Sequence, residues 1–362
     1  MRERLRLHRG APPGPVTAAC EALLAEAREA GDGEEVVRLL VMVSIAHARL
    51  GNALGAERVA REALAEADRL GDLALRAEAA MRLGVAVLEI DPADAVPHYR
   101  RALDAFTRLG DRYGQLRCQI NIGVACDRAG NNPAAEVSYA TALAIGRDIR
   151  ASNLAAVASL NLGVLLLKTG RFDVAHERFD EARQLFAALG NDLNRLAALY
   201  NLANVARARG DAAGALELYG ATAALAETLD YPDVRAGALA GAGLADLDLG
   251  AVRGGREQHA AVQAMLAART DPWFQGRELC EALAVRLAAL DGRADDAAAL
   301  LLDALDRADR HGQYAALWLA AECAGVLGGA GRVAEATLHR YLVHARALGY
   351  DPLIAKLRAA GA

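Results

Sequence analysis

The stretch SLNLGVLLLKTGRFDVAHERFDEA, residues 159–182, decides the fold because close variants of it recur at intervals of about forty residues. Residues 119–142 read QINIGVACDRAGNNPAAEVSYATA, and residues 199–222 read LYNLANVARARGDAAGALELYGAT. All three stretches carry an Asn, a small residue two positions later, a glycine before a polar turn, and then an alanine followed by an aromatic residue. Regular recurrence of one pattern predicts an array of equivalent units stacked on one another.

The spacing of the small residues predicts that each unit is a pair of helices. The turn glycine recurs at Gly51, Gly130, Gly170, Gly210, Gly250, Gly292 and Gly331, and one more unit fits around Asp91. In the second half of a unit, a small residue is followed four residues later by a larger one and three residues after that by another small one. This spacing places all three on one helix face. We therefore predict about eight helix–turn–helix units over residues 37–350.

The composition agrees with an all-α chain. Hydrophobic residues make up 54% of the 362 residues but aromatic residues only 4%, so the apolar mass is mostly Ala, Leu and Val. Ala and Leu are strong helix formers, and few runs along the chain are typical of strands. The predicted class is therefore all-α.

The pattern resembles the tetratricopeptide repeat, in a variant with a period near forty residues instead of the usual period of about 34. The residues that carry the resemblance in the clearest unit are Asn161, Gly163, Gly170, Ala175, Phe179 and Ala182. Long-period members of this family include kinesin light chains, the Leu-Gly-Asn polarity adaptors and the sensor arms of bacterial regulators. The resemblance implies a right-handed α-solenoid, or superhelix, whose first helices line a concave groove.

We expect four segments along the chain. Residues 1–16 are basic and Pro-rich and predict a flexible tail, and residues 17–30 predict an N-terminal capping helix. Residues 37–350 predict the superhelix, and residues 351–362 a C-terminal capping helix. Such caps cover the apolar ends of a repeat array with a polar outer face.

Charge and cysteine content argue against several classes of protein. The formal net charge is −5 and the pI is about 6.0, whereas a sequence-independent nucleic-acid binder needs a concentrated basic surface. The five cysteines are widely spaced without a CxxC pair, which argues against a zinc knuckle or a redox dithiol and favours a reducing, cytoplasmic location. We find neither a signal-peptide pattern nor an apolar stretch long enough to span a membrane.

The sequence contains no convincing catalytic motif. Residues 250–257, GAVRGGRE, have the glycine spacing of a phosphate-binding loop, but Arg256 and Glu257 stand where such a loop needs Lys and Ser or Thr. The eight histidines show no metal-ligand spacing, and no nucleophile lies in a G-x-S-x-G turn. We therefore expect a protein that is not an enzyme and that needs neither a cofactor nor a metal.

The Asn of the repeated pattern occupies one register of three consecutive units, at Asn121, Asn161 and Asn201, which we call the Asn row. A carboxamide both donates and accepts hydrogen bonds, so the Asn row could pair with the backbone of an extended peptide. In the long-period adaptors that this chain resembles, the matching Asn contacts the ligand backbone. The alternative is structural: each Asn bonds a neighbouring helix terminus and fixes the angle between units.

Other first-helix side chains are expected to share the groove with the Asn row. The predicted binding residues are Arg82, Arg117, Asn121, Arg128, Asn161, Lys168, Tyr200, Asn201, Asn204, Arg207 and Trp318. The basic members suit an acidic partner. We predict a scaffold that binds a peptide or protein segment in its concave groove. The alternatives are a sensor module related to the C-terminal arms of bacterial transcription regulators or signalling ATPases, and a homodimer formed through the last three units.

Overall fold

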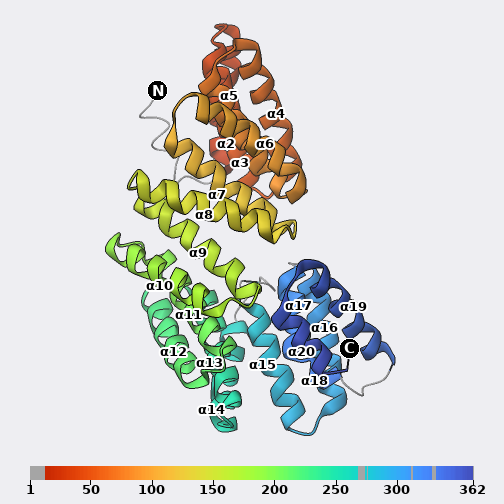
Figure 1. Ribbon diagram of the computed structural model, residues 1–362. Coiled ribbons are helices and arrows are strands. Elements are labelled where there is room, and N and C mark those ends of the chain that lie inside the picture. Colours follow the sequence, from red (N-terminus) through yellow and green to blue (C-terminus); the bar gives the residue numbers. More distant parts are fainter. Residues whose placement is uncertain (1–12, 268–273, 275, 311–312, 328–331, 362) are drawn as a thin grey trace. The chain divides into compact units, whose positions relative to one another are not determined.

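The structure, a computed structural model, describes residues 13–267, 274, 276–310, 313–327 and 332–361. These residues are predominantly helical and contain no strand (Figure 1). The all-α class predicted from the sequence is thereby confirmed. The tail predicted at residues 1–16 falls mostly on residues 1–12, which lie outside the described residues, as does the turn expected at Gly331.

The helices follow one another in pairs, as the repeat predicts. α2 (Pro13–Glu29) precedes the pairs and α20 (Asp351–Ala359) follows them. The pairs are α3 (Gly33–Arg49) with α4 (Ala53–Leu70), α5 (Leu73–Leu88) with α6 (Pro92–Arg108), α7 (Arg112–Arg128) with α8 (Asn132–Asp148), α9 (Ser152–Lys168) with α10 (Phe172–Ala188), α11 (Asp192–Ala208) with α12 (Ala212–Thr228), α13 (Pro232–Asp248) with α14 (Val252–Ala267), α15 (Arg277–Leu290) with α16 (Ala294–Asp309), and α17 (Gln313–Glu322) and α18 (Ala324–Leu327) with α19 (Arg332–Leu348).

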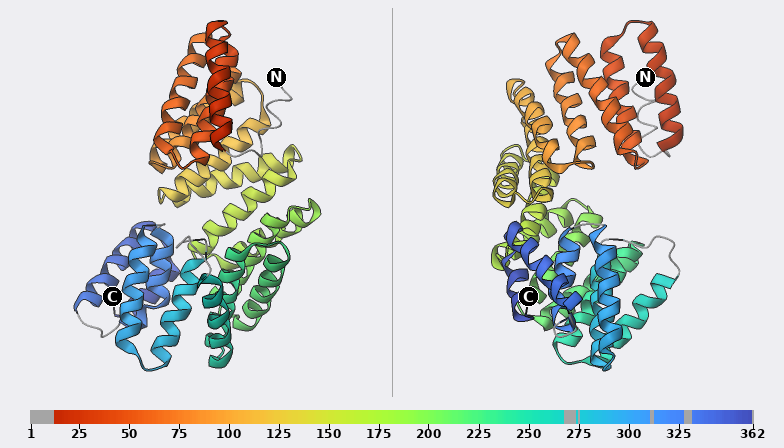
Figure 2. Two further views of the ribbon diagram at one scale, coloured as in Figure 1. Left: turned by 180° about the vertical axis from the view of Figure 1, so that it is seen from behind. Right: turned by 90° about the vertical axis from the view of Figure 1, so that its right-hand side faces the viewer.

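The chain divides into two compact units, Met1–Ala158 and Ser159–Ala362. Within each unit, helices that are neighbours in sequence pack side by side (Figure 2). The core of the second unit is continuous from Tyr200 on α11 to Leu357 on α20. The last helix is therefore part of that core, because Leu353 and Leu357 bury their side chains in it.

The repeated glycine ends the first helix of most pairs in a left-handed turn, at Gly51, Gly130, Gly170, Gly210, Gly250 and Gly292. Its φ angle lies between 71° at Gly51 and 83° at Gly210, a conformation that is unfavourable for residues with a Cβ atom. The second helices end in the same way at Gly71, Gly110 and Gly190. At the equivalent positions forty residues on from Gly110 and Gly190, Arg150 and Asp230 adopt φ angles of 56° and 58° without the freedom of glycine.

Small residues on the first helices make room for aromatic rings on the second helices. A Cβ atom on Gly84 would lie 2.6 Å from the Tyr99 ring, and one on Gly163 would lie 2.7 Å from the Phe179 ring. Both rings are fully buried and have no space to move away. The steric fit between the two helices of a pair therefore explains why this position repeats as a small residue.

An Asp or Asn after the turn glycine begins the next helix in most pairs. The Asp211 side chain accepts a hydrogen bond from the backbone N–H of Gly214 at 2.9 Å, which satisfies one of the free donors of the first turn. The same arrangement occurs at Asn52, Asp72, Asp111, Asn131 and Asn191, and Asp91 caps α6 in this way although it follows Ile90 instead of a glycine. One Gly–Asp or Gly–Asn step therefore ends one helix and starts the following one.

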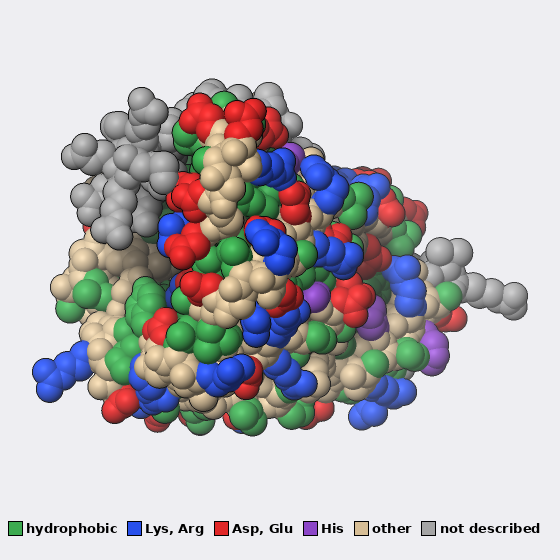
Figure 3. All heavy atoms as spheres, turned by 90° about the horizontal axis from the view of Figure 1, so that it is seen from above, with side chains coloured by type: hydrophobic (Ala, Val, Ile, Leu, Met, Phe, Trp, Pro, Cys, Tyr) green, Lys and Arg blue, Asp and Glu red, His purple; other side chains and the backbone are tan. Residues whose placement is uncertain are grey.

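Basic and acidic side chains are interspersed over the described residues on the face drawn in Figure 3, instead of gathering in separate areas. Ion pairs between residues of opposite charge on neighbouring helices are one reason for this mixing, as between Arg101 and Asp68, whose Nη2 and Oδ1 atoms are 2.6 Å apart. Among the described helices, none has both the length and the apolar character needed to cross a lipid bilayer.

Candidate functional site

The second unit contains a cavity of about 790 Å³ that is lined mainly by the first helices of its pairs. Most of the lining comes from α9, α11, α13, α15 and α17, α20 adds a further wall, and α10, α12 and α18 contribute Phe172, Tyr219, Ala324 and Gly325. Six of the residues predicted from the sequence lie on this lining: Lys168, Tyr200, Asn201, Asn204, Arg207 and Trp318. The structure thus brings together residues that are up to 150 positions apart, from Lys168 to Trp318.

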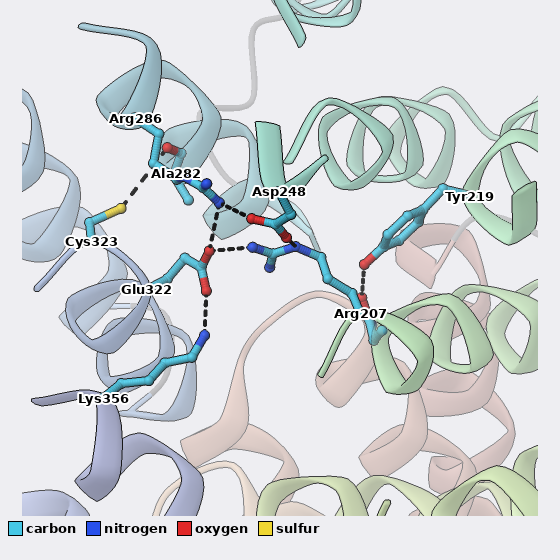
Figure 4. A network of polar contacts seen from close by, with 9 residues as sticks. Arg207, Tyr219, Asp248, Ala282, Arg286, Glu322, Cys323 and Lys356 are labelled. Atoms are coloured by element: carbon cyan, nitrogen blue, oxygen red, sulfur yellow. Dashed lines mark hydrogen bonds and ion pairs between the residues drawn. The ribbon is translucent and has the colours of Figure 1, made fainter. Parts of the chain in front are cut away.

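A network of five charged side chains forms one part of the lining (Figure 4). Arg207 Nε lies 2.8 Å from Asp248 Oδ2, and Arg286 Nη1 lies 2.7 Å from Asp248 Oδ1. Glu322 pairs with Arg207, with Arg286 at 3.2 Å and with Lys356 Nζ at 2.7 Å. Each of α11, α13, α15, α17 and α20 contributes one member. We call these five residues the charge network.

Glu322 is the central acid of the charge network. Its side chain is only 4% exposed, and burial by itself would raise its pKa. The positive charges and hydrogen bonds of Arg207 and Lys356 outweigh burial and lower the pKa of Glu322 from 4.5 to about 2. Burial likewise lowers the pKa of Arg207, but Glu322 and Asp248 raise it overall. Glu322 and Arg207 are therefore charged at neutral pH, and the charge network joins three basic side chains to two acidic ones.

Tyrosine and asparagine side chains form a second part of the lining. The Tyr219 hydroxyl donates a hydrogen bond to Asn204 Oδ1 at 2.6 Å, and the Tyr200 and Tyr219 rings meet edge to face with centroids 6.1 Å apart. Burial raises the pKa of both phenols, so both are neutral at physiological pH. Asn201 Nδ2 donates to the carbonyl oxygen of Ala197 one turn earlier at 2.9 Å.

The structure separates the members of the Asn row. Asn201 lies on the cavity lining, while Asn161 belongs to the same unit without being among the lining residues. Asn121 belongs to the first unit. The structural alternative predicted that each Asn bonds the end of a neighbouring helix. Asn201 instead donates its hydrogen bond to a carbonyl oxygen of its own helix.

The three predicted arginines Arg82, Arg117 and Arg128 lie in the first unit, and Arg117 and Arg128 form ion pairs within it. Arg117 Nη1 lies 2.8 Å from Glu78 Oε1, and Arg128 Nη1 lies 2.8 Å from Glu89 Oε1. Burial lowers the pKa of Arg82, and the nearby charge of Arg117 lowers it further. Arg117 and Arg128 therefore connect α7 to residues of α5 and of its C-terminal end.

The sequence prediction missed four members of the charge network and one further acid of the cavity. These are Asp248, Arg286, Glu322, Lys356 and Glu278. A signal for the first four is present in the sequence, since charges of alternating sign follow Arg207 at successive separations of 41, 38, 36 and 34 residues. Among the described residues, no group of three or more His, Cys, Asp and Glu side chains is arranged to hold a metal ion.

Comparisons with known proteins agree with the helix-pair fold. The family model of the tetratricopeptide repeat matches residues 75–148 and 154–228. The apo form of RapI shares 15% sequence identity at a TM-score of 0.61, over 73% of this chain and 94% of that one. A Rap protein complexed with Competence and Sporulation Factor shares 15% identity at a TM-score of 0.54, over 90% of this chain and 83% of that one.

A third similar structure is the signal transduction ATPase PH0952 of Pyrococcus horikoshii, which has a tetratricopeptide repeat sensor. It shares 16% identity at a TM-score of 0.60, over 67% of this chain and 38% of that one. These identities are low, so the likeness concerns the fold alone. No curated protein matches the sequence significantly.

Proposed function

Since this chain is a tetratricopeptide-like repeat protein, we propose that its second unit binds a peptide or protein segment in the cavity, without catalysis. The observation that carries this proposal is the lining itself. Apolar and aromatic side chains such as Leu167, Leu279 and Trp318 surround a small number of convergent polar groups, which is the composition of a ligand pocket. The volume of about 790 Å³ suits a short segment.

The carboxamides of Asn201 and Asn204 support a peptide as the ligand. Within the described residues Asn201 Oδ1 accepts no hydrogen bond, and Asn204 Nδ2 donates none. The two groups therefore offer one acceptor and one donor on the same helix wall. A peptide backbone has the complementary groups at every residue, whatever its sequence.

An acidic segment suits the cavity best. The charge network has an excess of one positive charge, and Lys168 lines the cavity as well, with its Nζ atom 5.2 Å from the centroid of the Tyr314 ring. A carboxylate on the ligand would compensate this excess. Low-dielectric surroundings strengthen such a contact relative to an exposed ion pair.

The test compares the same substitution at the same register in the two units. Peptides that bind the whole chain are selected from a random library, and their affinity is measured calorimetrically for wild type, Asn201→Ala and Asn121→Ala. Loss of one hydrogen bond of about 1 kcal/mol predicts about five- to tenfold weaker binding for Asn201→Ala. Asn121→Ala is the control and should bind normally. Equal affinity of Asn201→Ala and wild type would contradict binding at this wall.

A second candidate function is a sensor module of a larger signalling system. It is supported by the likeness to PH0952, whose repeats are described as a sensor, and by the fact that this chain spans 38% of that protein. Sequencing the flanking reading frames would test it, because an adjoining ATPase or DNA-binding domain is required. The five cysteines are free and buried, which supports a reducing, cytoplasmic setting for either function.

Self-association through the last pairs is a subsidiary part of the proposal. Exposed Leu290, Leu300 and Val343 supply apolar surface there, with exposed fractions of 56%, 40% and 52%. Light scattering at increasing protein concentration tests this, and a constant monomer mass rejects it.

A further inference from the structure

Glu278 differs from the other carboxylates that line the cavity in its lack of a cationic partner among the described residues. Three carboxylates line it, and two of them, Asp248 and Glu322, belong to the charge network. Glu278 forms no ion pair with any described residue. It stands in the first turn of α15, immediately after Gly276 and Arg277, and Arg277 directs its guanidinium to Glu281 instead, with 2.8 Å between Nε and Oε1.

The surroundings of Glu278 leave its charge incompletely compensated. Burial raises the pKa of Glu278, and hydrogen bonds from the backbone N–H groups of Glu278 and Gly276 offset only part of this effect. A partly buried carboxylate without a cation is costly, because its two backbone hydrogen bonds replace only part of the hydration that it has lost. A positively charged group arriving in the cavity would restore the compensation.

Tyr200 provides a second polar group on the same lining. Its side chain is 7% exposed, and its buried hydroxyl has no hydrogen-bond partner among the residues that the structure describes. The hydroxyl lies where Gly237 and Gly276 approach each other, and a Cβ atom on Gly276 would be only 2.7 Å from it. Two glycines therefore make the space in which this hydroxyl sits. The backbone N–H of Gly276 also donates a hydrogen bond to Glu278, so Glu278 and the Tyr200 hydroxyl lie in one corner of the cavity, which we call the Glu278–Tyr200 corner.

We propose that Glu278 and Tyr200 together bind an ammonium group of the ligand, either a free α-amino terminus or a lysine side chain. This inference rests on the proposed function, because it assumes that a peptide occupies the cavity. An ammonium group donates three hydrogen bonds and carries one positive charge, so it can satisfy a carboxylate and a phenol oxygen at once.

The proposal gives the cavity two poles and therefore a direction for the ligand. The Glu278–Tyr200 corner takes the cationic end, and the charge network, with its excess positive charge, takes an anionic end. A short zwitterionic peptide binds in one orientation under this arrangement, since the reverse orientation would place like charges together.

The experiment uses three soluble probes: pentaalanine with free termini, N-acetyl-pentaalanine, and an N-acetylated pentapeptide of alanine with lysine in the middle. Binding is followed through Trp318 fluorescence in a Trp273→Phe background, which leaves Trp318 as the single tryptophan of the chain. Affinities are measured for this protein and for its Glu278→Gln and Tyr200→Phe variants. Glu217→Gln removes an exposed carboxylate of α12 that does not line the cavity and serves as the matched control.

We expect free pentaalanine to bind about tenfold more tightly than its acetylated form, as for a hydrogen bond to a charged group. Glu278→Gln should abolish this difference and leave the affinity of the acetylated peptide unchanged. Tyr200→Phe should reduce it in part. Recovery of affinity by the lysine-containing probe identifies a side-chain ammonium as a ligand as well.

Two outcomes would contradict the proposal, and they differ in whether they refute the ammonium site alone or peptide binding as well. If the peptides bind but acetylation or Glu278→Gln makes no difference, the ammonium site is wrong and the proposed function stands. If no probe binds at millimolar concentration, peptide binding in this cavity is itself refuted, and the ammonium site with it. Circular dichroism of each variant confirms that the chain is folded.

Discussion

Replacing Glu322 by glutamine tests the energetic role of the charge network. Glutamine keeps the size of the side chain but removes the charge that Arg207, Arg286 and Lys356 share. The lowering of the Glu322 pKa from 4.5 to about 2 corresponds to about 3 kcal/mol of folding free energy at neutral pH. Because the side chain is only 4% exposed, solvent screening reduces this little. We therefore expect Glu322→Gln to lower the free energy of unfolding by about 3 kcal/mol.

The pH dependence of the effect follows from the direction of the shift. The pKa of Glu322 is lower in the folded chain than in the unfolded chain, so its stabilisation is complete above about pH 4.5 and is lost as the pH falls toward 2. Urea unfolding of wild type and variant, followed by far-ultraviolet circular dichroism at pH 7 and at pH 2.5, measures both quantities. Glu217→Gln is the control on an exposed carboxylate and should change little.

Two outcomes would refute this reasoning. If the free energies of unfolding of wild type and Glu322→Gln differ by less than about 1 kcal/mol at pH 7, ion pairing in the charge network only offsets the cost of desolvating its members. A large difference that persists unchanged at pH 2.5 would show that the variant destabilises the chain through packing and not through charge.

Three further predictions concern the repeat. Arg150→Gly and Asp230→Gly should each raise stability by up to about 1 kcal/mol, measurable as a higher Tm, since glycine removes the strain of a positive φ angle. Gly163→Ala should lower the free energy of unfolding by about 1–3 kcal/mol, because the added methyl group overlaps a fully buried ring, and an unchanged urea midpoint would contradict this. The five thiols should react with Ellman's reagent rapidly only after unfolding, because all are buried, and burial raises the pKa of Cys118 and of Cys280 to about 12.

The helix pairs could be predicted from the sequence because they depend on contacts that recur along the chain. Gly163 and Phe179 lie within one pair, 16 residues apart, and the same fit recurs between Gly84 and Tyr99 and between Gly123 and Tyr139, so it produces a repeated pattern in the sequence. Turn glycines such as Gly170 and Gly210 recur for a local reason as well, since each ends a helix in a left-handed conformation. Patterns of this kind can be read without knowing how the pairs stack.

The cavity could be predicted only in part, because its chemistry depends on contacts between distant pairs. Arg207 and Glu322 are 115 residues apart, and neither carries a local sign that the other will be its partner. The shared register of the Asn row was equally insufficient, since register does not say which helices face a cavity and only Asn201 lies on it. Glu278 was missed for a related reason: its significance is the lack of a cation, which no sequence pattern records.

The charge network also restricts how this protein can change in length during evolution. Repeat arrays commonly gain or lose single repeats, because each repeat mainly contacts its neighbours. Here the charges contributed by α11, α13, α15, α17 and α20 alternate as positive, negative, positive, negative and positive. Deleting the α13–α14 pair would bring Arg207 and Arg286 next to each other, and duplicating it would juxtapose two copies of Asp248. The alternation of charges is preserved only when an even number of helix pairs is gained or lost. The charge network therefore constrains the number of repeats in the second unit as well as their sequence.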